Sequence, residues 1–599
     1  MLGYAGRIAR VNLTRRSVKE ENLDTKLAAS YIGGKGFGTW FLYNELESDA
    51  DPLGPENKLI FAVGPATGSI VPTAGRYEVF FKSPLTGIYG ESSCGGHFAP
   101  QLKSAGYDLL IIEGRASKPT YLWIHDRIVE FKDAKHLWGV ETYETEDTIK
   151  DELRDRRIEV ACIGPAGEAL VEFATISNDY WRQAGRCGGG TVMGSKRLKA
   201  IAARGSDMPE VASPDMLRQF VQEFLQTIKN NPALGTTYPK YGTTALVNTT
   251  NLQGVFPTRY WSKGVFEKYE DINSEALVNK IFVARKACFG CPIGCGKLTE
   301  VKAGPYLGTR VEGPEFETIY AFGGLCEIPR IETIAKINDM CDRFGMDTIT
   351  AGNVVAFAIE SYRKGKLTSE VRLDYGDPDS VLYILEKIAR REGLGETLAR
   401  GVRKASEALG LSEIAVHVKG LEPPGYDPRG LKGMALGYCV SARGACHLRS
   451  TAYIFELRGS VDRFGTENKA SLVKEYEDRF AIFDSMILCR FLRDVCDWSV
   501  LSKILALTAG IQLNENELRV AAERIVTLSR MFNVKSGISR KDDCLPKRLM
   551  EEALPEGPSK GHAVSKADVD GMLDEYYGLR GWNSEGIPSR QKEAQLGIS

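Results

Sequence analysis

The chain has 599 residues, of which 43% are hydrophobic and 26% charged, and 77 basic against 78 acidic side chains leave a net charge of −1. This composition is typical of globular proteins and excludes a disordered or collagen-like chain, and the balanced charge gives no sign of nucleic-acid binding. No secretory signal and no run of about 18 apolar residues is present, so we expect no membrane span and a cytoplasmic protein. The 13 cysteines are then best interpreted as reduced thiols or metal ligands.

Residues 1–207 consist mostly of short segments rich in β-branched and aromatic residues, separated by turns. We predict strands within residues 6–13, 58–65, 76–83, 107–114, 120–126, 127–133 and 171–177. Short strands at this spacing favour an antiparallel sheet or a sandwich without βαβ units.

Helical periodicity begins after Ser213, a good N-cap residue that is followed by Pro214. We predict helices over 216–230, 332–345, 381–393, 469–491 and 515–532. A loop-rich stretch at 419–430 marks a further boundary. We therefore predict an α+β protein with a sandwich-like N-terminal sheet domain (1–207) and two mainly helical domains (208–416 and 417–599).

Three cysteines stand close together in the sequence, at Cys288, Cys291 and Cys295. Thiolates in such a Gly- and Pro-rich loop bind iron–sulfur clusters or zinc. Zinc knuckles usually contain two C-x2-C pairs, and only one is present, so a cluster is favoured over structural zinc. Spacing alone does not choose the fourth ligand among Cys326, Cys341, Cys439, Cys446, Cys489, Cys496 and Cys544.

A glycine-rich segment over 189–196 nearly matches a phosphate-binding loop of nucleotide hydrolases. It ends in Gly-Ser-Lys, whereas that loop requires Gly-Lys followed by Ser or Thr. We therefore reject nucleotide hydrolysis.

Several long and unusual strings are distributed over essentially the whole chain. They include YIGGKGFGTWFLY, VGPATGSIVPTAGR, FKSPLTGIYGESSCGGHF, AGRCGGGTVMGSKRLKAI, CFGCPIGC, EGPEFETI, KGLEPPGYDPRG and LDEYYGLRGW. Through them the chain resembles the aldehyde ferredoxin oxidoreductase family. The resemblance implies tungsten, or molybdenum, held by two pyranopterins beside one [4Fe–4S] cluster, with a pterin-binding N-terminal domain.

The resemblance implies Cys489, the last residue of the motif Asp484–Cys489, as the fourth cluster ligand. Asp484 and Leu488 would line the pterin, but Ile487 replaces the glycine of the family motif, and isoleucine tolerates a positive φ poorly. The related motif at 342–347 supplies Asp342 and Asp347. A carboxylate can accept two adjacent N–H groups from a pterin edge.

Further cofactor residues follow from the same resemblance: Arg76, Gly95, Arg186, Gly188 and Arg449. Arginines suit the two phosphates, which a Mg²⁺ ion bridges in the family. The glycine-rich loop would let backbone N–H groups approach the pterin and its phosphate.

The resemblance also implies the reacting residues. His447 would polarise a metal-bound oxygen or the substrate carbonyl, and Glu317 would act as the general base, with Glu315 nearby. A helix-stabilising carboxylate is the plainer interpretation of Glu315. Cys446 stands where relatives often carry aspartate, and Tyr426 and His97 are weaker candidates for the pocket.

The implied function is the oxidation of aldehydes to carboxylic acids, with electrons passing through the cluster to ferredoxin or to iron–sulfur or flavin subunits. Alternatives are another tungsten-pterin activity, such as a benzoyl-CoA-type thioester reductase, or a non-catalytic protein with structural zinc. No histidine has glutamate three residues before it. We therefore expect a homodimer or hetero-oligomer without the inter-subunit iron that an E-x-x-H motif binds in some family members.

Overall fold

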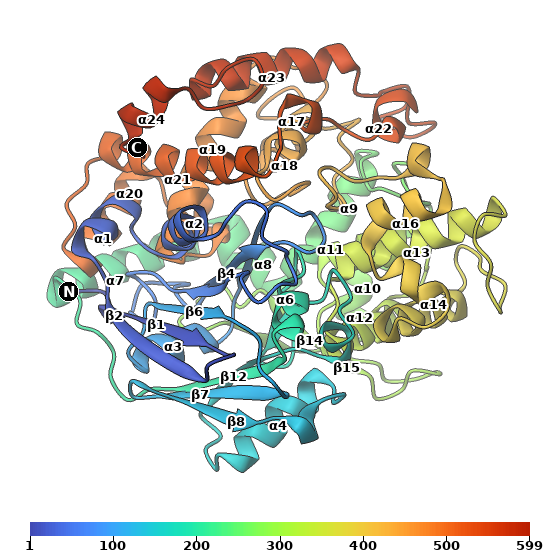
Figure 1. Cartoon of the computed structure of the whole chain (residues 1–599). Coiled ribbons are helices and arrows are strands. Elements are labelled where there is room, and N and C mark those ends of the chain that lie inside the picture. The colour runs from blue at the N-terminus through green and yellow to red at the C-terminus, as the bar shows by residue number, and fades with distance from the viewer. Residues whose placement is uncertain (599) are drawn as a thin grey trace.

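The computed structural model describes residues 1–598, so Ser599 of the third predicted domain lies outside the described residues. The N-terminal part forms two six-stranded sheets (Figure 1), with strand orders β2-β1-β6-β3-β4-β5 and β11-β10-β9-β12-β7-β8. The strands are β1 (Arg7–Asn12), β2 (Ser17–Asn22), β3 (Leu59–Ala62), β4 (Tyr77–Lys82), β5 (Tyr89–Cys94), β6 (Leu109–Glu113), β7 (Thr120–His125), β8 (Ile128–Asp133), β9 (Glu159–Cys162), β10 (Ile176–Asn178), β11 (Arg182–Ala184) and β12 (Leu198–Arg204).

Side chains of β3 alternate between two hydrophobic cores. Leu59 and Phe61 belong to the same core as Leu122 of β7, so this core joins the two sheets. Ile60 and Ala62 lie on the other face, in a core that also contains residues of α1 (Thr25–Tyr31) and α2 (Gly34–Glu45). Burial on both faces explains why this strand is continuously apolar.

The sheet prediction needs two corrections. Each six-stranded sheet contains a parallel pair, β1 with β6 and β7 with β12, so neither sheet is purely antiparallel. The partners are distant in sequence, and local periodicity carries no information on their direction. Only the end of the predicted strand at 171–177 is extended, as part of β10.

The remainder of the chain is mainly helical, and the α+β prediction is confirmed. The predicted helices correspond to α7 (Pro214–Asn230), α12 (Ile331–Phe344), α14 (Pro378–Arg390), α19 (Lys469–Met486) and α21 (Glu515–Lys535). Pro214 is the first residue of α7 as expected, although the Ser213 side chain makes no capping hydrogen bond.

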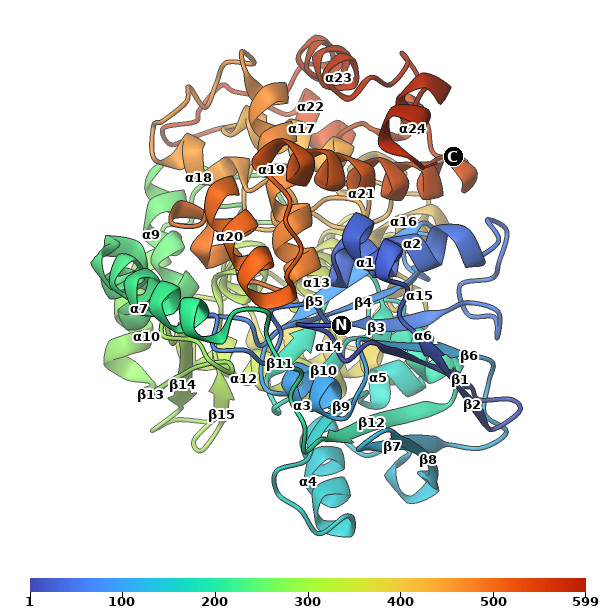
Figure 2. The ribbon, with the colours of Figure 1, turned by 90° about the vertical axis from the view of Figure 1, so that its left-hand side faces the viewer.

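The other helices are shorter or follow sequence without a clear apolar period. They are α3 (Phe98–Ser104), α4 (Thr142–Glu152), α5 (Pro165–Glu168), α6 (Gly189–Ser195), α8 (Tyr238–Tyr241), α9 (Ala245–Leu252), α10 (Ser274–Lys280), α11 (Phe316–Thr318), α13 (Thr348–Arg363), α15 (Leu394–Leu398), α16 (Gly401–Leu409), α17 (Lys432–Val440), α18 (Ala452–Leu457), α20 (Trp498–Ala509), α22 (Lys547–Glu551), α23 (Lys566–Arg580) and α24 (Arg590–Leu596). A three-stranded sheet of β13 (Phe282–Lys286), β14 (Gly296–Glu300) and β15 (Arg310–Glu312) lies between helices of the middle segment (Figure 2).

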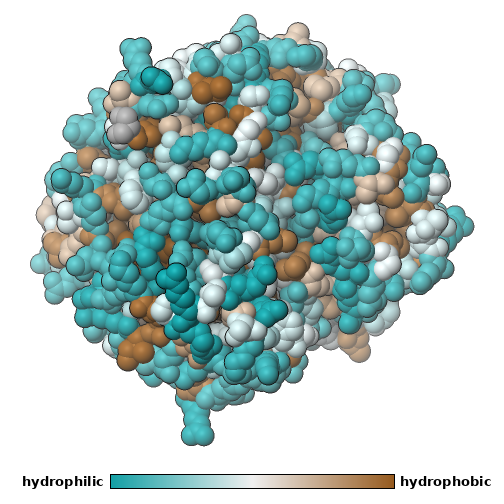
Figure 3. All heavy atoms as spheres, viewed as in Figure 1, coloured by the Kyte–Doolittle hydropathy of each residue, from teal (hydrophilic) through white to brown (hydrophobic). Residues whose placement is uncertain are grey.

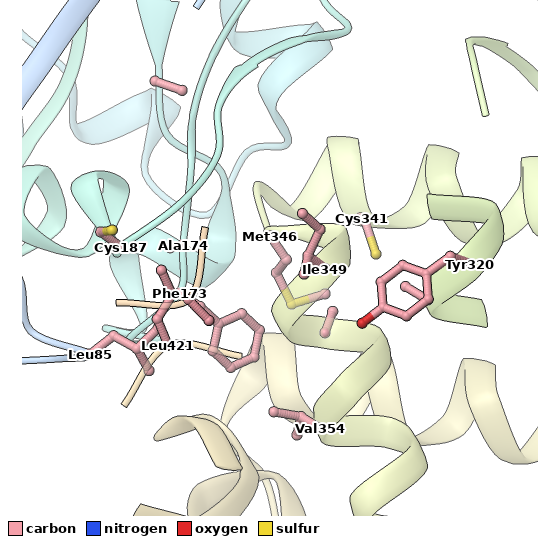
Figure 4. Close-up of a cluster of buried hydrophobic side chains, with 14 of the residues drawn as sticks. Leu85, Phe173, Ala174, Cys187, Tyr320, Cys341, Met346, Ile349, Val354 and Leu421 are labelled. Atoms are coloured by element: carbon pink, nitrogen blue, oxygen red, sulfur yellow. The ribbon is translucent and has the colours of Figure 1, made fainter. Parts of the chain in front are cut away.

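The largest core runs through all three predicted domains, from Ala9 to Trp582. In Figure 4, Phe173 and Cys187 of the N-terminal part face Met346, Ile349 and Leu421 of the helical part. The domain boundaries therefore stay a prediction. On the face shown in Figure 3, apolar residues are scattered among polar ones, and the helices within 1–598 include none with the length and hydropathy of a membrane span.

Candidate active site

A cavity of about 380 Å³ lies where β5, β11, the cysteine loop and the helical segments meet. It brings together the site residues predicted from the sequence, except Gly188 and the weaker candidates Tyr426 and His97. Those that line it are Arg76, Gly95, Arg186, Cys288, Cys291, Cys295, Glu315, Glu317, Asp342, Asp347, His447, Arg449, Asp484, Leu488 and Cys489.

The four predicted cluster ligands all line this cavity. Cys288, Cys291 and Cys295 come from the loop between β13 and β14, and Cys489 directly precedes the 3-10 helix η7 (Arg490–Asp494). All four are free thiols with intermediate exposure. Within residues 1–598, no three His, Cys, Asp or Glu side chains form a group suited to a single metal ion.

Thr73 connects the two chain segments that carry these cysteines. Its backbone N–H donates to the Gly290 carbonyl at 3.2 Å. Its Oγ1 accepts from the backbone N–H of Cys489, also at 3.2 Å. Thr73 thus holds the fourth cysteine next to the other three, a role that the sequence analysis missed.

Gly95 shows how closely the backbone approaches this part of the cavity. A Cβ atom at Gly95 would lie 2.7 Å from Cys288 Sγ and 3.5 Å from Arg76 Nη1. The Arg76 guanidinium donates to Ser93 Oγ at 2.9 and 3.1 Å. A side chain at position 95 would therefore displace the thiol or the arginine.

The two aspartate motifs occupy equivalent places but have different partners. Asp342, in the last turn of α12 before Gly345, accepts from the amides of Gln183 (3.1 Å) and Asn338 (2.7 Å). Burial and the nearby Asp339 raise its pKa well above the usual range. Asp484 instead accepts from Arg449 Nη1 at 2.9 Å and from Arg490.

Asp347 is already held by other groups. It caps α13 by accepting from the backbone N–H groups of Ile349 (3.1 Å) and Thr350 (3.2 Å). Its Oδ2 lies 2.9 Å from Arg186 Nε. Its contact with the cavity is therefore shared with a structural role at the N-terminus of α13.

A buried row of ion pairs connects Asp484 to charged residues farther from the cavity. Lys35 Nζ lies 2.7 Å from Glu91, and Arg449 Nη1 lies 2.5 Å from Glu91 and 2.9 Å from Asp484. Burial opposes ionisation of Glu91, but Arg449 and Lys35 outweigh it and lower its pKa to about 2. The row therefore fixes Arg449 at the cavity wall.

Several arginine nitrogens at this wall are buried without a hydrogen-bond partner. Within the described chain these include Arg449 Nε and Nη2, Arg490 Nε and Arg186 Nε, although the last is in ion-pair range of Asp347. Unmatched guanidinium donors in a low-dielectric site favour an anionic ligand. This donor set fits a phosphate-bearing cofactor.

Glu317 and His447, the two residues predicted to take part in the reaction, lie next to each other in the cavity wall. Glu317, in α11, accepts from the Gly425 backbone N–H through Oε2 at 3.0 Å. Its Oε1 makes no hydrogen bond and lies 3.5 Å from His447 Nε2. Burial raises the pKa of Glu317 to about 8.

His447 is neutral because burial, followed by Arg443 and Arg186, holds its pKa well below the usual range. Its Nδ1 has no partner within residues 1–598. The Tyr426 ring lies 5.5 Å from the imidazole ring, centroid to centroid. His97 instead bonds Asp179 at 2.8 Å and is outside the residues that line the cavity.

Cys446 is buried beside these groups. Its Sγ accepts from Arg443 at 2.9 and 3.3 Å and from the Leu448 backbone N–H at 3.2 Å. Burial alone would raise the pKa of this thiol, but Arg443 and Arg449 lower it to about 6. Cys446 therefore carries a negative charge at neutral pH, as an aspartate would.

Two of the predicted site residues have structural roles at the starts of helices. Gly188 starts α6 with φ 80°, and a Cβ there would lie 2.1 Å from the Glu172 carbonyl, so glycine is required for chain packing rather than for the cavity wall. Glu315 lines the cavity but occupies the N-cap position of α11 and accepts from Thr243.

The sequence analysis missed several residues that line the cavity, namely Arg182, Gln183, Asn338, Arg443 and Arg490. Two of these arginines could have been identified from their positions in the sequence. Arg490 directly follows Cys489, and Arg443 begins the segment that ends in His447 and Arg449. Gln183 and Asn338 had no signal, because single amides are common on any surface.

One protein family matches nearly the whole sequence of the chain. The family description "Aldehyde ferredoxin oxidoreductase, N-terminal domain" matches residues 8–205, and "domains 2 & 3" of the same family matches residues 219–598. The chain belongs to the aldehyde ferredoxin oxidoreductase family and is an oxidoreductase.

Its relatives agree with this assignment. Proteins named tungsten-containing aldehyde ferredoxin oxidoreductase are 40% identical in Pyrococcus furiosus and 41% in Thermococcus kodakarensis, each over 100% of both chains. An aliphatic sulfonate oxidoreductase, WOR-like subunit, of P. furiosus is 32% identical over 100% of this chain and 97% of its own. A solved structure, the active site complex BamBC of benzoyl coenzyme A reductase with 1,5-dienoyl-CoA, has a TM-score of 0.87 at 26% identity and covers 100% and 97% of the two chains.

Proposed function

We propose that the protein oxidises aldehydes to carboxylic acids at a bis-pyranopterin tungsten centre, or its molybdenum counterpart. Each turnover converts RCHO and water into RCOO⁻, three protons and two electrons. One observation carries this proposal: Glu317, whose Oε1 lacks a hydrogen bond, lies 3.5 Å from His447, and both line the same arginine-rich cavity as the four cysteines. The names of the relatives at 40–41% identity support the same reaction.

The cofactors would be held by the residues at the cavity wall. Arg76, Arg186 and Arg449 would bind the phosphates, which a Mg²⁺ ion would bridge, and Asp342 and Asp484 would accept from the pterin edges. Cys288, Cys291, Cys295 and Cys489 would bind a [4Fe–4S] cluster. When bound, the metal centre would supply the two-electron acceptor for this oxidation, and the cluster would supply a one-electron route to ferredoxin or an electron-transfer subunit.

Glu317 and His447 then have separate tasks. Neutral His447 donates or accepts one hydrogen bond at Nε2 and orients the substrate oxygen. Ionised Glu317 accepts a proton from the attacking water at Oε1, the oxygen without a partner. Tyr426 and Tyr453, whose ring centroids are 3.8 Å apart, pack beside His447 and would hold its imidazole in place.

A reductase of aromatic thioesters is the second candidate, because the benzoyl coenzyme A reductase complex shares the fold. The higher identity to the aldehyde ferredoxin oxidoreductases, 40% against 26%, favours aldehyde oxidation. A mass-spectrometric product assay with an aldehyde and with an aromatic acyl-CoA separates the two.

Metal analysis of anaerobically purified protein tests the proposal. About four iron and one tungsten or molybdenum per chain, with dye reduction that depends on aldehyde, is the expected result. About one zinc per chain, without tungsten, molybdenum or iron, would overturn it and favour the structural-zinc alternative.

A further inference from the structure

A second pocket, of about 600 Å³, opens next to residues 231–233 and the end of η7. Its polar wall is made by Arg458, Arg479, Arg493, Asp494 and Asp497. Arg479 and Arg493 are buried, with exposures of 9% and 4%, and form the inner wall. Arg458, Asp494 and Asp497 are exposed at the rim.

The two rim carboxylates are already engaged. Asp494 forms a bidentate ion pair with Arg458, in which two guanidinium nitrogens donate to its two oxygens at 2.9 and 3.2 Å. Asp497 caps α20 by accepting from the Val500 backbone N–H at 3.0 Å. Three guanidinium groups face two carboxylates, which leaves about one positive charge in the pocket wall.

The inner arginines retain unused donors. Arg479 Nη2 donates to the Arg493 carbonyl at 3.1 Å, and Arg493 donates to the Arg490 carbonyl and to Tyr238 Oη. Within residues 1–598, the Nε atoms of both arginines have no hydrogen-bond partner. Arg493 Nε is 4.0 Å from Asp494, beyond hydrogen-bond distance. Buried cations without full compensation are costly, and an anion would relieve this.

The pocket lies one layer of side chains away from the catalytic couple. Arg493 contacts Tyr238 Oη at 3.0 Å and acts electrostatically on Tyr453. The Tyr453 ring stacks on Tyr426, and its centroid is 6.2 Å from that of His447. These aromatic side chains therefore lie between Arg493 of the second pocket and His447 of the active-site cavity.

We propose that the second pocket binds a small organic carboxylate, the class of product that the proposed reaction releases. A single excess positive charge suits a monoanion better than a phosphate dianion, and a guanidinium fork matches the two oxygens of a carboxylate. This inference rests on the proposed function for the identity of the carboxylate, but the binding itself requires no turnover.

Calorimetric titration of the purified holoenzyme with benzoate tests the site. Arg479→Gln removes an inner cation, and we expect it to weaken benzoate binding by about ten- to a hundredfold. The exposed Arg372, which pairs with Asp374 at 3.0 Å, provides the control Arg372→Gln with unchanged affinity. Benzamide, the neutral analogue, and inorganic phosphate should bind at least about tenfold more weakly than benzoate.

A rim variant covers the case in which Arg479→Gln fails to fold. Arg458→Gln frees Asp494 to compete for the inner arginines, so it should also weaken benzoate binding. Unchanged benzoate affinity in the folded variants, or equal binding of phosphate, would overturn the inference. Loss of aldehyde oxidation with intact benzoate binding would instead overturn the proposed function and leave the carboxylate site standing.

Discussion

At the scale of single residues, burial sets the charges of Glu317 and His447. Glu317 stays protonated up to about pH 8, while His447 stays neutral at pH values well below the usual pKa of histidine. Burial, followed by the nearby arginines, keeps His447 uncharged, so it cannot stabilise an ionised Glu317 as a cationic partner would. Proton acceptance by Glu317 therefore depends on pH.

We expect kcat/KM for an aldehyde to rise with pH through about 8, because Glu317 must lose its proton before it can act as a base. Glu317→Gln should remove this rise and lower the rate by about 10²- to 10⁴-fold. Glu315→Gln should retain the pH dependence. A viologen-linked assay across the pH range measures both, and an unchanged rise in Glu317→Gln would exclude this role.

Cys446 gives a second prediction, on stability. Its pKa in the folded protein is about 6 against 9.0 for an ordinary thiol. A lowered pKa stabilises the fold above the ordinary pKa, and this contribution is lost as the pH falls through about 6. It amounts to on the order of 4 kcal/mol in the free energy of unfolding at high pH.

Urea unfolding at pH 6 and pH 9 measures this contribution. Cys446→Ser should be destabilised more strongly at pH 9 than at pH 6, because Arg443 then loses a charged partner. The buried Cys326, whose pKa burial raises, serves as the control Cys326→Ser. An equal destabilisation of Cys446→Ser at both pH values would show that its thiol is uncharged.

At the scale of elements, the start of α2 packs closely against the end of α19 because Gly34 has no side chain. Ile487 ends α19 at φ 63°, in the left-handed region that costs about 1–2 kcal/mol for a residue other than glycine. A Cβ at Gly34 of α2 would lie 2.2 Å from the Asp484 carbonyl and 2.5 Å from the Ile487 side chain. Gly34 thus leaves room for the unusual Ile487, and the Asp484–Cys489 turn is retained.

Thr73 makes a second close connection between elements, because it hydrogen-bonds both the cysteine loop and Cys489. Thr73→Val preserves its shape and its backbone N–H but removes the acceptor for the Cys489 N–H. We expect a loss of about 1 kcal/mol in stability and faster release of iron to a chelator. Thr73→Ser, which keeps the hydroxyl, should release iron at the wild-type rate. Equal rates for the valine and wild-type proteins would contradict this role.

At the scale of the whole molecule, the cavity lies where the predicted domains meet. Arg76, Gly95 and Arg186 come from the sheet domain, Asp342 from the middle segment and Asp484 from the last. The core of Figure 4 joins the same three parts. None of the parts contains a complete site.

The shared core predicts that the three parts unfold together. Calorimetry of the metal-free protein should give one heat-absorption peak, because separation of any part would expose Phe173, Met346 and Leu421, which are buried together. Two resolved peaks would show that at least one domain is independently stable.

Periodicity predicted five of the longer helices and the strands β1, β3, β4, β6, β7 and β8, because each depends on residues close in sequence. It missed the long helices α13 and α23 and more than half of the strands. Nearly all of the site residues that the family resemblance implied line the cavity, since the strings that carry the resemblance are local too. The parallel pairs β1–β6 and β7–β12 were not predictable in this way. Neither were Gln183 and Asn338, which become partners of Asp342 only through contact across the chain.

The sequence by itself determined the family, the α+β class and the cysteines, aspartates, His447 and Glu317 of the site, because these are properties of residue type and short spacing. Only the tertiary structure decided the charge states and the partners. Burial keeps Glu317 protonated and, together with arginines, keeps His447 neutral, whereas Arg443 and Arg449 give the buried Cys446 its charge. The second pocket arises for the same reason, since the field in a protein interior depends on which charges folding brings together.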